Sequence, residues 1–202
     1  MKPFKVALVG IGTVGSGVFK VLQRNQAEIK ARTGRGIEIT VVADRNVNHA
    51  RSIVGDGVEV VDDAFAAVAR PDVDVVVELI GGYTVAKDLV LKAIENGKHV
   101  VTANKALLAV HGTEIFEAAQ QKGVMVAFEA AVAGGIPIIK ALREGLTANR
   151  IQWLAGIING TTNFILSEMR DKGLDFDVVL KEAQRLGYAE ADPTFDIEGV
   201  DA

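Results

Sequence analysis

Valine-rich apolar runs alternate with amphipathic stretches along roughly the first 128 residues, and this order constrains the fold more than any other feature. The runs show little polar alternation, which is typical of strands in a parallel sheet with helices on both faces. We predict strands at residues 5–9, 37–42, 58–61, 73–78, 98–102 and 124–128, and helices at residues 14–30, 63–69, 84–96 and 112–122. The repeated strand–helix–strand order predicts an α/β fold with a doubly wound parallel sheet and right-handed crossovers.

The pattern changes after residue 128. Residues 129–137 are small, apolar and rich in glycine, which indicates a close-packed junction, and we predict two domains, 1–128 and 129–202. In the second domain we expect helices at residues 138–146, 161–172 and 175–186, and one strand at residues 150–158. A single strand cannot form a sheet by itself. We therefore expect this domain to be incomplete or to borrow strands from elsewhere.

The composition argues against several classes of protein. The net charge is −4 and no basic stretch stands out, so we expect neither nucleic acid nor an anionic membrane as a partner. The absence of cysteine excludes disulfides and thiolate metal sites. The longest uncharged stretch, residues 151–167, is too short and too polar to span a bilayer. With no signal-peptide pattern at the N-terminus, we expect a soluble, cytoplasmic protein.

The first predicted strand leads directly into the glycine motif G-I-G-T-V-G at residues 10–15. In such a motif Gly10 permits the tight turn, Gly12 lets the backbone approach a diphosphate, and Gly15 lets helix and strand pack closely. Thr13 and Val14 open the following helix, whose N–H groups and positive dipole end attract the diphosphate. The motif in this context predicts a Rossmann-type site for NAD or NADP. The alternative is a glycine-rich turn that binds nothing.

The second predicted strand ends beside Asp44 and Arg45, where the adenosine ribose of a dinucleotide lies in this architecture. Asp44 is suited to accept the ribose hydroxyls of NAD, whereas Arg45 is suited to bind the 2′-phosphate of NADP. Asp44 stands farther past Gly15 than the usual spacing of about 20 residues, a difference that a longer first helix and its loop can absorb. The choice of cofactor stays open, and Asp44 has the alternative role of capping the short helix after it.

Thr102 ends the fifth predicted strand and Lys105 follows it, at the carboxyl edge of the sheet where ligands of α/β proteins bind. A lysine there can donate a proton to a carbonyl oxygen that gains charge during hydride transfer. The alternative is a solvated lysine at the start of a helix, and the residues alone do not favour the catalytic role.

The C-terminal sixteen residues, 187–202, carry five carboxylates and no lysine or arginine. The five are Glu190, Asp192, Asp196, Glu198 and Asp201. Such a run is either a solvated tail or a pocket for a cationic group. Glycines, a proline and several large apolar residues are interspersed among the carboxylates, and a solvated acidic tail is poor in such residues. The pattern favours the pocket.

Five segments, in order, resemble homoserine dehydrogenase over essentially the whole chain: GIGTVG, TANK, EAAVAGGIP, GIINGTTNFIL and the most specific, GYAEADPTFDIEGVD. The resemblance implies an enzyme that interconverts L-homoserine and L-aspartate 4-semialdehyde with NAD or NADP, in threonine and methionine biosynthesis. It implies a homo-oligomer, a dimer or tetramer, and makes residues 129–202 the first part of an α+β substrate and dimerisation domain. The rivals are another Rossmann-type amino-acid dehydrogenase and a non-catalytic, dinucleotide-binding redox sensor.

By the same resemblance, individual residues acquire roles. Lys105 matches a lysine beside the nicotinamide and the reacting carbonyl. The carboxylates that match the amino-acid pocket are Glu190, Asp196 and Asp201, and a buried α-ammonium group needs such partners. A monovalent cation such as Na⁺ would be bound, largely through backbone carbonyls, by Glu129, Val132, Gly134 and Ile136. Glu129 has the alternative of a surface or interface carboxylate, and Thr161, in the turn before a predicted helix, that of a helix cap.

The resemblance also carries a departure. The family's second catalytic lysine would fall just beyond Ala202. We therefore expect the chain to be a fragment that binds the cofactor but shows very little turnover by itself.

Overall fold

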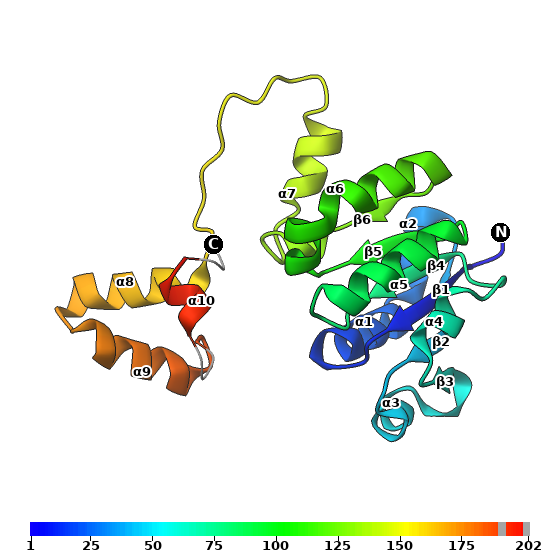
Figure 1. The fold of residues 1–202 in the computed structure, drawn as a ribbon, viewed down its shortest axis with the longest axis horizontal. Coiled ribbons are helices and arrows are strands. Elements are labelled where there is room, and N and C mark those ends of the chain that lie inside the picture. Colours follow the sequence, from blue (N-terminus) through cyan, green and yellow to red (C-terminus); the bar gives the residue numbers. More distant parts are fainter. Residues whose placement is uncertain (190–192, 200–202) are drawn as a thin grey trace. The chain divides into compact units, whose positions relative to one another are not determined.

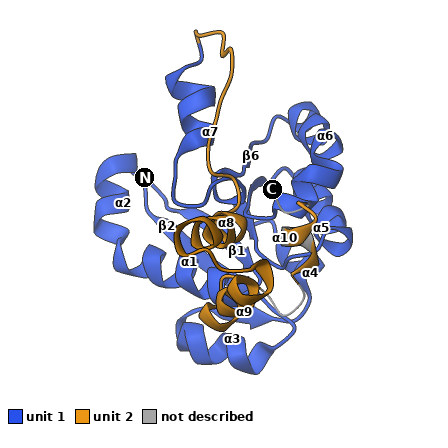
Figure 2. Cartoon of the chain, turned by 90° about the vertical axis from the view of Figure 1, so that its left-hand side faces the viewer, with its two compact units in different colours: residues 1–147 blue, residues 148–202 orange. Residues whose placement is uncertain are grey.

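The chain divides into two compact units, residues 1–147 and 148–202 (Figure 2). The computed structural model describes residues 1–189 and 193–199, and for residues 195 and 196 it describes the backbone alone. Among the described residues, no helix combines the length and the apolar character needed to cross a membrane. The domain division at residue 129 stays a prediction.

A six-stranded parallel sheet forms the centre of the first unit (Figure 1). Its order is β3-β2-β1-β4-β5-β6, and every neighbouring pair is parallel. The strands are β1 (Phe4–Val9), β2 (Ile37–Ala43), β3 (Glu59–Val61), β4 (Val75–Glu78), β5 (His99–Thr102) and β6 (Val126–Ala127). All six predicted strands therefore form, and the doubly wound α/β fold of Rossmann type is confirmed.

Helices of the first unit differ from the prediction at their boundaries. They are α1 (Thr13–Arg24), α2 (Gln26–Thr33), α3 (Val47–Val54), α4 (Ala64–Val68), α5 (Thr84–Glu95), α6 (Lys105–Lys122) and α7 (Ile138–Lys140). Short 3₁₀ turns η1 (Gly55–Gly57) and η2 (Glu129–Ala131) and a π turn η3 (Ala141–Gly145) complete the unit. The helix predicted at 14–30 breaks at Asn25, which leaves helical geometry. The helix predicted from residue 112 begins at Lys105, because the Asn104 side chain accepts a hydrogen bond from Leu107 N.

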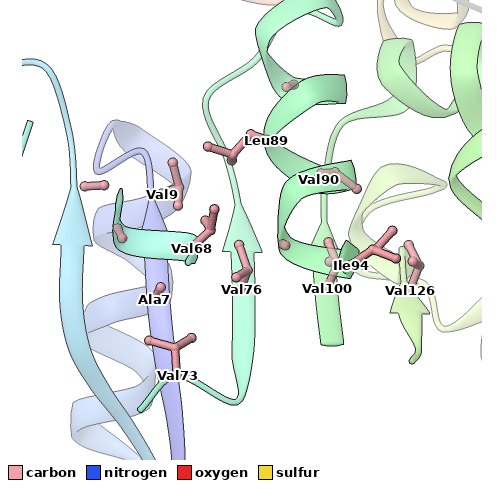
Figure 3. Packing of buried hydrophobic residues seen from close by; sticks show 14 of the residues in the cluster. Ala7, Val9, Val68, Val73, Val76, Leu89, Val90, Ile94, Val100 and Val126 are labelled. Carbon is pink, nitrogen blue, oxygen red and sulfur yellow. The ribbon is translucent and has the colours of Figure 1, made fainter. Parts of the chain in front are cut away.

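Apolar side chains alternate between the two faces of the sheet, as the pleat requires. On one face, Ala7 and Val9 pack with residues of α4, α5 and α6. Figure 3 shows Leu89 and Ile94 of α5 on this side, with Ile94 beside Val100 and Val126. On the other face, residues of β1 and β2 pack with α1 and α3. Because both faces are buried at the centre of the sheet, β1 and β4 contain continuous buried runs, V-A-L-V and V-V-E, with little polar alternation.

Helices make up the regular structure described in the second unit. They are α8 (Gly160–Lys172), α9 (Phe176–Leu186) and α10 (Thr194–Ile197). Ile165, Val179, Ala183 and Ala189 form its small buried core. The strand predicted at residues 150–158 is wrong, since these residues adopt neither helix nor strand. Within the described residues no other strand adjoins this segment to supply the hydrogen bonds that a strand needs.

Candidate functional site

The carboxyl ends of four strands align at one edge of the sheet. Val9, the last residue of β1, pairs with Ala43 on one side and with Glu78 on the other, and Glu78 pairs with Thr102. From the β1–β4 pair outward, the strands follow the order β1, β2, β3 on one side and β4, β5, β6 on the other. At such a switch point the loops after neighbouring strands diverge and leave a crevice in which α/β proteins bind ligands.

Steric contacts explain two glycines of the turn after β1. Gly10 has φ +92°, and a Cβ there would lie 2.6 Å from the Leu79 carbonyl oxygen. A Cβ on Gly15 would lie 2.0 Å from the Gly10 carbonyl oxygen. Neither contact is possible for a real side chain, so the turn and the docking of α1 against β1 require glycine at both positions.

Gly12 has a different reason to be glycine. Its φ is −66°, an ordinary value, and a Cβ there would meet nothing within 4 Å. The fold does not need a glycine at this position, but a ligand that approaches the backbone closely does. Thr13 and Val14 beside it are exposed. Because no described side chain caps α1 and its first turn holds no acidic residue, the N–H groups there are suited to bind a diphosphate.

Asp44 ties the end of β2 to the glycine turn. One carboxylate oxygen accepts a hydrogen bond from Ile11 N at 2.9 Å, and the other accepts one from Asn46 N at 2.8 Å. Asn46, rather than Asp44, caps α3, since its side chain accepts a hydrogen bond from His49 N. Asp44 therefore supports the turn directly, and its neighbour Arg45 is exposed.

A cleft of about 820 Å³ opens at this edge. Its walls include Gly10 and Gly12 of the glycine turn, Asp44 and Arg45 after β2, and residues 81–85 at the start of α5. Four of the predicted cofactor-binding residues thus line one cavity, namely Gly10, Gly12, Asp44 and Arg45. The others are not among its lining residues: Thr13, Val14, Gly15, Thr102 and Lys105. The cradle at Gly12 and the uncapped helix end fit a dinucleotide cofactor.

Lys105 is the first residue of α6 and is exposed. Thr102, three positions before it, is fully buried. The Thr102 hydroxyl donates a hydrogen bond of 2.6 Å to Glu78 and accepts one of 3.0 Å from Asn104 N. Our reading of the sequence missed Glu78. A glutamate at the end of a V-V-V run, at the ligand edge of the sheet, is a pattern that could have pointed to it.

The predicted cation loop begins at Glu129, whose two carboxylate oxygens accept hydrogen bonds from Ile139 N at 3.0 Å and Lys140 N at 2.9 Å. Glu129 therefore holds the start of α7. The other three predicted ligands, Val132, Gly134 and Ile136, are exposed along the loop between η2 and α7. Ala133 in this loop has φ +47°, an uncommon value for a residue other than glycine. The cation site stays a prediction.

Most of the predicted substrate carboxylates lie outside what the structure describes. Of the three, Glu190 and Asp201 fall outside the described residues, and Asp196 is described only as part of the backbone of α10.

In the second unit the start of α8 contacts Tyr188, which lies just before the acidic run. The Thr161 hydroxyl donates a 2.6 Å hydrogen bond to the Tyr188 carbonyl oxygen, and the Phe164 and Tyr188 rings meet edge to face at 5.0 Å. Asn159, not Thr161, caps the helix by accepting a hydrogen bond from Thr162 N. Residues 159–164 thus support the backbone just before the predicted substrate pocket.

Family models match both parts of the chain. The model described as "Homoserine dehydrogenase, NAD binding domain" matches residues 10–129, and the model described as "Homoserine dehydrogenase" matches residues 137–202. Together they cover the glycine turn, the cleft, Lys105 and the acidic C-terminal run.

Individual relatives agree with these models. The chain is 67% identical over 202 residues to a homoserine dehydrogenase of Pseudomonas aeruginosa and 46% identical to one of Bacillus subtilis. The crystal structure of a homoserine dehydrogenase from Thiobacillus denitrificans matches the whole chain with a TM-score of 0.94 and 67% identity. A hyperthermophilic archaeal homoserine dehydrogenase in complex with NADPH matches with a TM-score of 0.84 and 26% identity. The chain spans about half the length of the curated relatives, 46% for that of P. aeruginosa and 47% for that of B. subtilis.

Proposed function

This chain belongs to the homoserine dehydrogenase family, and we propose that the whole protein interconverts L-homoserine and L-aspartate 4-semialdehyde with NAD or NADP. The observation that carries this proposal is the glycine turn at the strand switch point. Gly12 is left open there for a diphosphate, within a chain whose two family models both describe homoserine dehydrogenase. The binding domain described by one model and the NADPH complex of one relative support a nicotinamide cofactor.

In the proposed reaction the nicotinamide, when bound, supplies the hydride for reduction of the aldehyde or accepts it in the reverse direction. Lys105 donates the proton that the developing alkoxide oxygen requires, and removes it from the hydroxyl during oxidation. Its position supports this role, because it follows β5 at the edge where the glycine turn and Asp44 also lie. Asp44 and Arg45 contact the adenosine ribose, and Arg45 accommodates the 2′-phosphate when the cofactor is NADP.

The substrate pocket belongs to the acidic run. We propose that Glu190, Asp196 and Asp201 pair with the α-ammonium group of the amino acid, whose charge must be compensated when water is removed. The contacts of Thr161 and Phe164 with Tyr188 support this role, because they hold the chain that leads into the run. A monovalent cation bound at Glu129, Val132, Gly134 and Ile136 would order the glycine-rich junction at residues 129–137.

The proposed substrate and cofactor are metabolites of the cell interior, so we propose a cytoplasmic enzyme of threonine and methionine biosynthesis. We also propose that the complete protein is a homo-oligomer, a dimer or tetramer, with the domain that begins at residue 129 contributing to both substrate binding and dimerisation.

The direct test is to incubate the complete enzyme with L-homoserine and either NAD⁺ or NADP⁺ and to follow the nicotinamide absorbance. We expect reduction of the cofactor with homoserine and none with other amino acids. Reduction with a different amino acid only would support the rival dehydrogenase. Cofactor binding without reduction by any amino acid would support the redox sensor.

Replacement of Lys105 tests the proton transfer. We expect Lys105→Ala in the complete enzyme to lower kcat by about 10² to 10⁴, the usual contribution of a general acid or base, and to leave the Kd of the cofactor within about threefold, since Lys105 lies outside the diphosphate cradle. Steady-state kinetics and a cofactor titration by fluorescence measure the two quantities. A weaker Kd with an unchanged kcat would contradict the proposed role.

A further inference from the structure

Glu78 is a buried carboxylate with no role in the function described so far. It is 0% exposed and is the only acidic side chain buried among the residues that the structure describes. It ends β4, after three consecutive valines, at the edge of the sheet that faces the cleft. An apolar residue there would avoid the desolvation of a carboxyl group. A polar residue that the fold does not favour, at the ligand edge of the sheet, suggests a functional constraint.

The hydrogen bonds of Glu78 run in two directions from the end of β4. One oxygen accepts from Ile80 N at 3.0 Å, which fixes the chain where it enters the turn of Gly81 and Gly82. The other accepts from the Thr102 hydroxyl at 2.6 Å, across to β5. Glu78 therefore connects two neighbouring strands at the height of the cleft.

The second direction continues to the start of α6. The Thr102 hydroxyl accepts from Asn104 N at 3.0 Å, the Asn104 side-chain oxygen accepts from Leu107 N at 3.0 Å, and its amide nitrogen donates to the Gly82 carbonyl oxygen at 2.6 Å. These bonds close a ring from Glu78 through Thr102 and Asn104 to the turn that follows Ile80. Lys105 is the next residue after Asn104, so the ring determines where its backbone lies.

We propose that Glu78 is a positioning residue for Lys105: through Thr102 and Asn104 it orients the first turn of α6 relative to the Gly81–Gly82 wall of the cleft. This inference rests on the proposed function, because Lys105 is the proton-transfer group there. The buried location supplies rigidity, since hydrogen bonds that are shielded from water are not exchanged for bonds to solvent.

The test is a double-mutant cycle in the complete enzyme with homoserine as substrate. Glu78→Gln keeps the size of the side chain but replaces one acceptor oxygen by a donor, so it cannot reproduce both hydrogen bonds. We expect a fall in kcat of about tenfold, because small displacements of a catalytic group are costly. In a Lys105→Ala background the same change should alter kcat by less than about twofold, since its effect passes through Lys105.

Lys98→Met is the matched control. Lys98 is also a buried polar residue, 8% exposed, and its amino group donates to the Val73 carbonyl oxygen at 2.6 Å at the opposite end of β5. We expect this variant to lower the melting temperature and to leave kcat unchanged. If Glu78→Gln fails to fold, Thr102→Val breaks the same ring with a side chain of nearly equal size, and the same cycle is measured with it.

The inference is overturned if the change at Glu78 lowers kcat equally with and without Lys105, as a general structural defect would, or leaves kcat unchanged. Failure of the proposed function is a separate result, seen when the unmodified complete enzyme does not oxidise homoserine.

Discussion

The contacts that a Cβ atom would make distinguish the glycines required by the fold from those required by a ligand, in and beside the glycine turn after β1. A Cβ on Gly15 would overlap the backbone of Gly10, whereas Cβ atoms on Gly12 and Gly17 would have no neighbour within 4 Å. The motif predicted these separate reasons for Gly12 and Gly15, and the contacts at the two positions agree with it. Gly17 lies outside the motif.

This distinction predicts opposite effects for two matched changes. Gly12→Ala should leave the free energy of unfolding nearly unchanged and weaken the Kd of the cofactor at least about tenfold, because its methyl group occupies the space left for the diphosphate. Gly17→Ala, within α1, should stabilise the protein by about 0.5–1 kcal/mol and leave the Kd unchanged. Denaturant unfolding and a fluorescence titration with NADPH measure both. Equal cofactor affinity in the two variants would argue against a diphosphate at Gly12.

An ion pair lies at the edge of the sheet where β3 and β4 begin. Arg70 donates hydrogen bonds to Asp72 at 3.0 and 3.3 Å and also pairs with Glu59 of β3. The hydrogen bonds from Arg70 hold the pKa of the Asp72 carboxyl below its ordinary value of 3.8. Because the pKa of Asp72 is lower in the folded state, the pair stabilises the protein when the pH is above the ordinary pKa of the carboxyl group. This stabilisation is lost as the pH falls through the lower pKa of the folded state.

Asp72→Asn should therefore lower the free energy of unfolding at neutral pH but not in acid. Because the Asp72 side chain is 37% exposed, solvent screens the pair, and we expect a loss of about 0.5 kcal/mol near neutral pH. The loss should disappear in acid, where Asp72 is protonated in both states. Urea unfolding of both proteins across this range measures the difference. A gap that stays constant down to the most acidic pH would show that the charge of Asp72 is not its cause.

Capping residues determine where the elements of this chain begin. Asn46, Asp63, Asn104 and Asn159 each accept a hydrogen bond from an N–H group in the first turn of the helix that follows. The cap at Asn104 places the start of α6 at Lys105 and so brings this lysine to the carboxyl edge of the sheet. Periodicity alone missed this start, because a cap is a single residue whose effect depends on the local backbone.

Two changes at Asn104 separate its cap from its contact with the cleft wall. Asn104→Ala removes the cap and should cost about 1 kcal/mol. Asn104→Asp keeps an oxygen for Leu107 N but loses the donor to the Gly82 carbonyl, so it should retain most of the stability and lose activity. Unfolding curves and kcat, measured in the complete enzyme, give both effects. Equal instability of the two variants would contradict the cap.

At the scale of the whole molecule the two units have cores of very different size. The core of the first unit covers both faces of a six-stranded sheet. In the second unit the described buried residues are Ile165, Val179, Ala183 and Ala189. A core this small offsets little of the conformational entropy lost when α8 and α9 form.

We therefore expect amide hydrogen exchange in α8 and α9 to be much faster than in β1 and β4 when residues 1–202 are studied by themselves. Ile165→Ala should remove the remaining protection of α8 and α9 and leave that of the sheet unchanged, since truncation of a buried isoleucine costs about 2–5 kcal/mol. Mass spectrometry of exchanged peptides resolves the two regions. Equal protection of both units would show that they unfold together.

The sequence by itself determined the sheet and the cofactor turn. Continuous valine runs, glycines at turn positions and the helix periods are local properties, and the six strands formed where these patterns predicted them.

Tertiary structure decided what local patterns do not encode. Asp44 meets Ile11, and Glu78 meets Thr102, across gaps of 33 and 24 residues, because parallel pairing brings strand ends together that are distant in the chain. Residues 150–158 have a strand-like sequence but form no strand, because a strand exists only where a second strand supplies its hydrogen bonds.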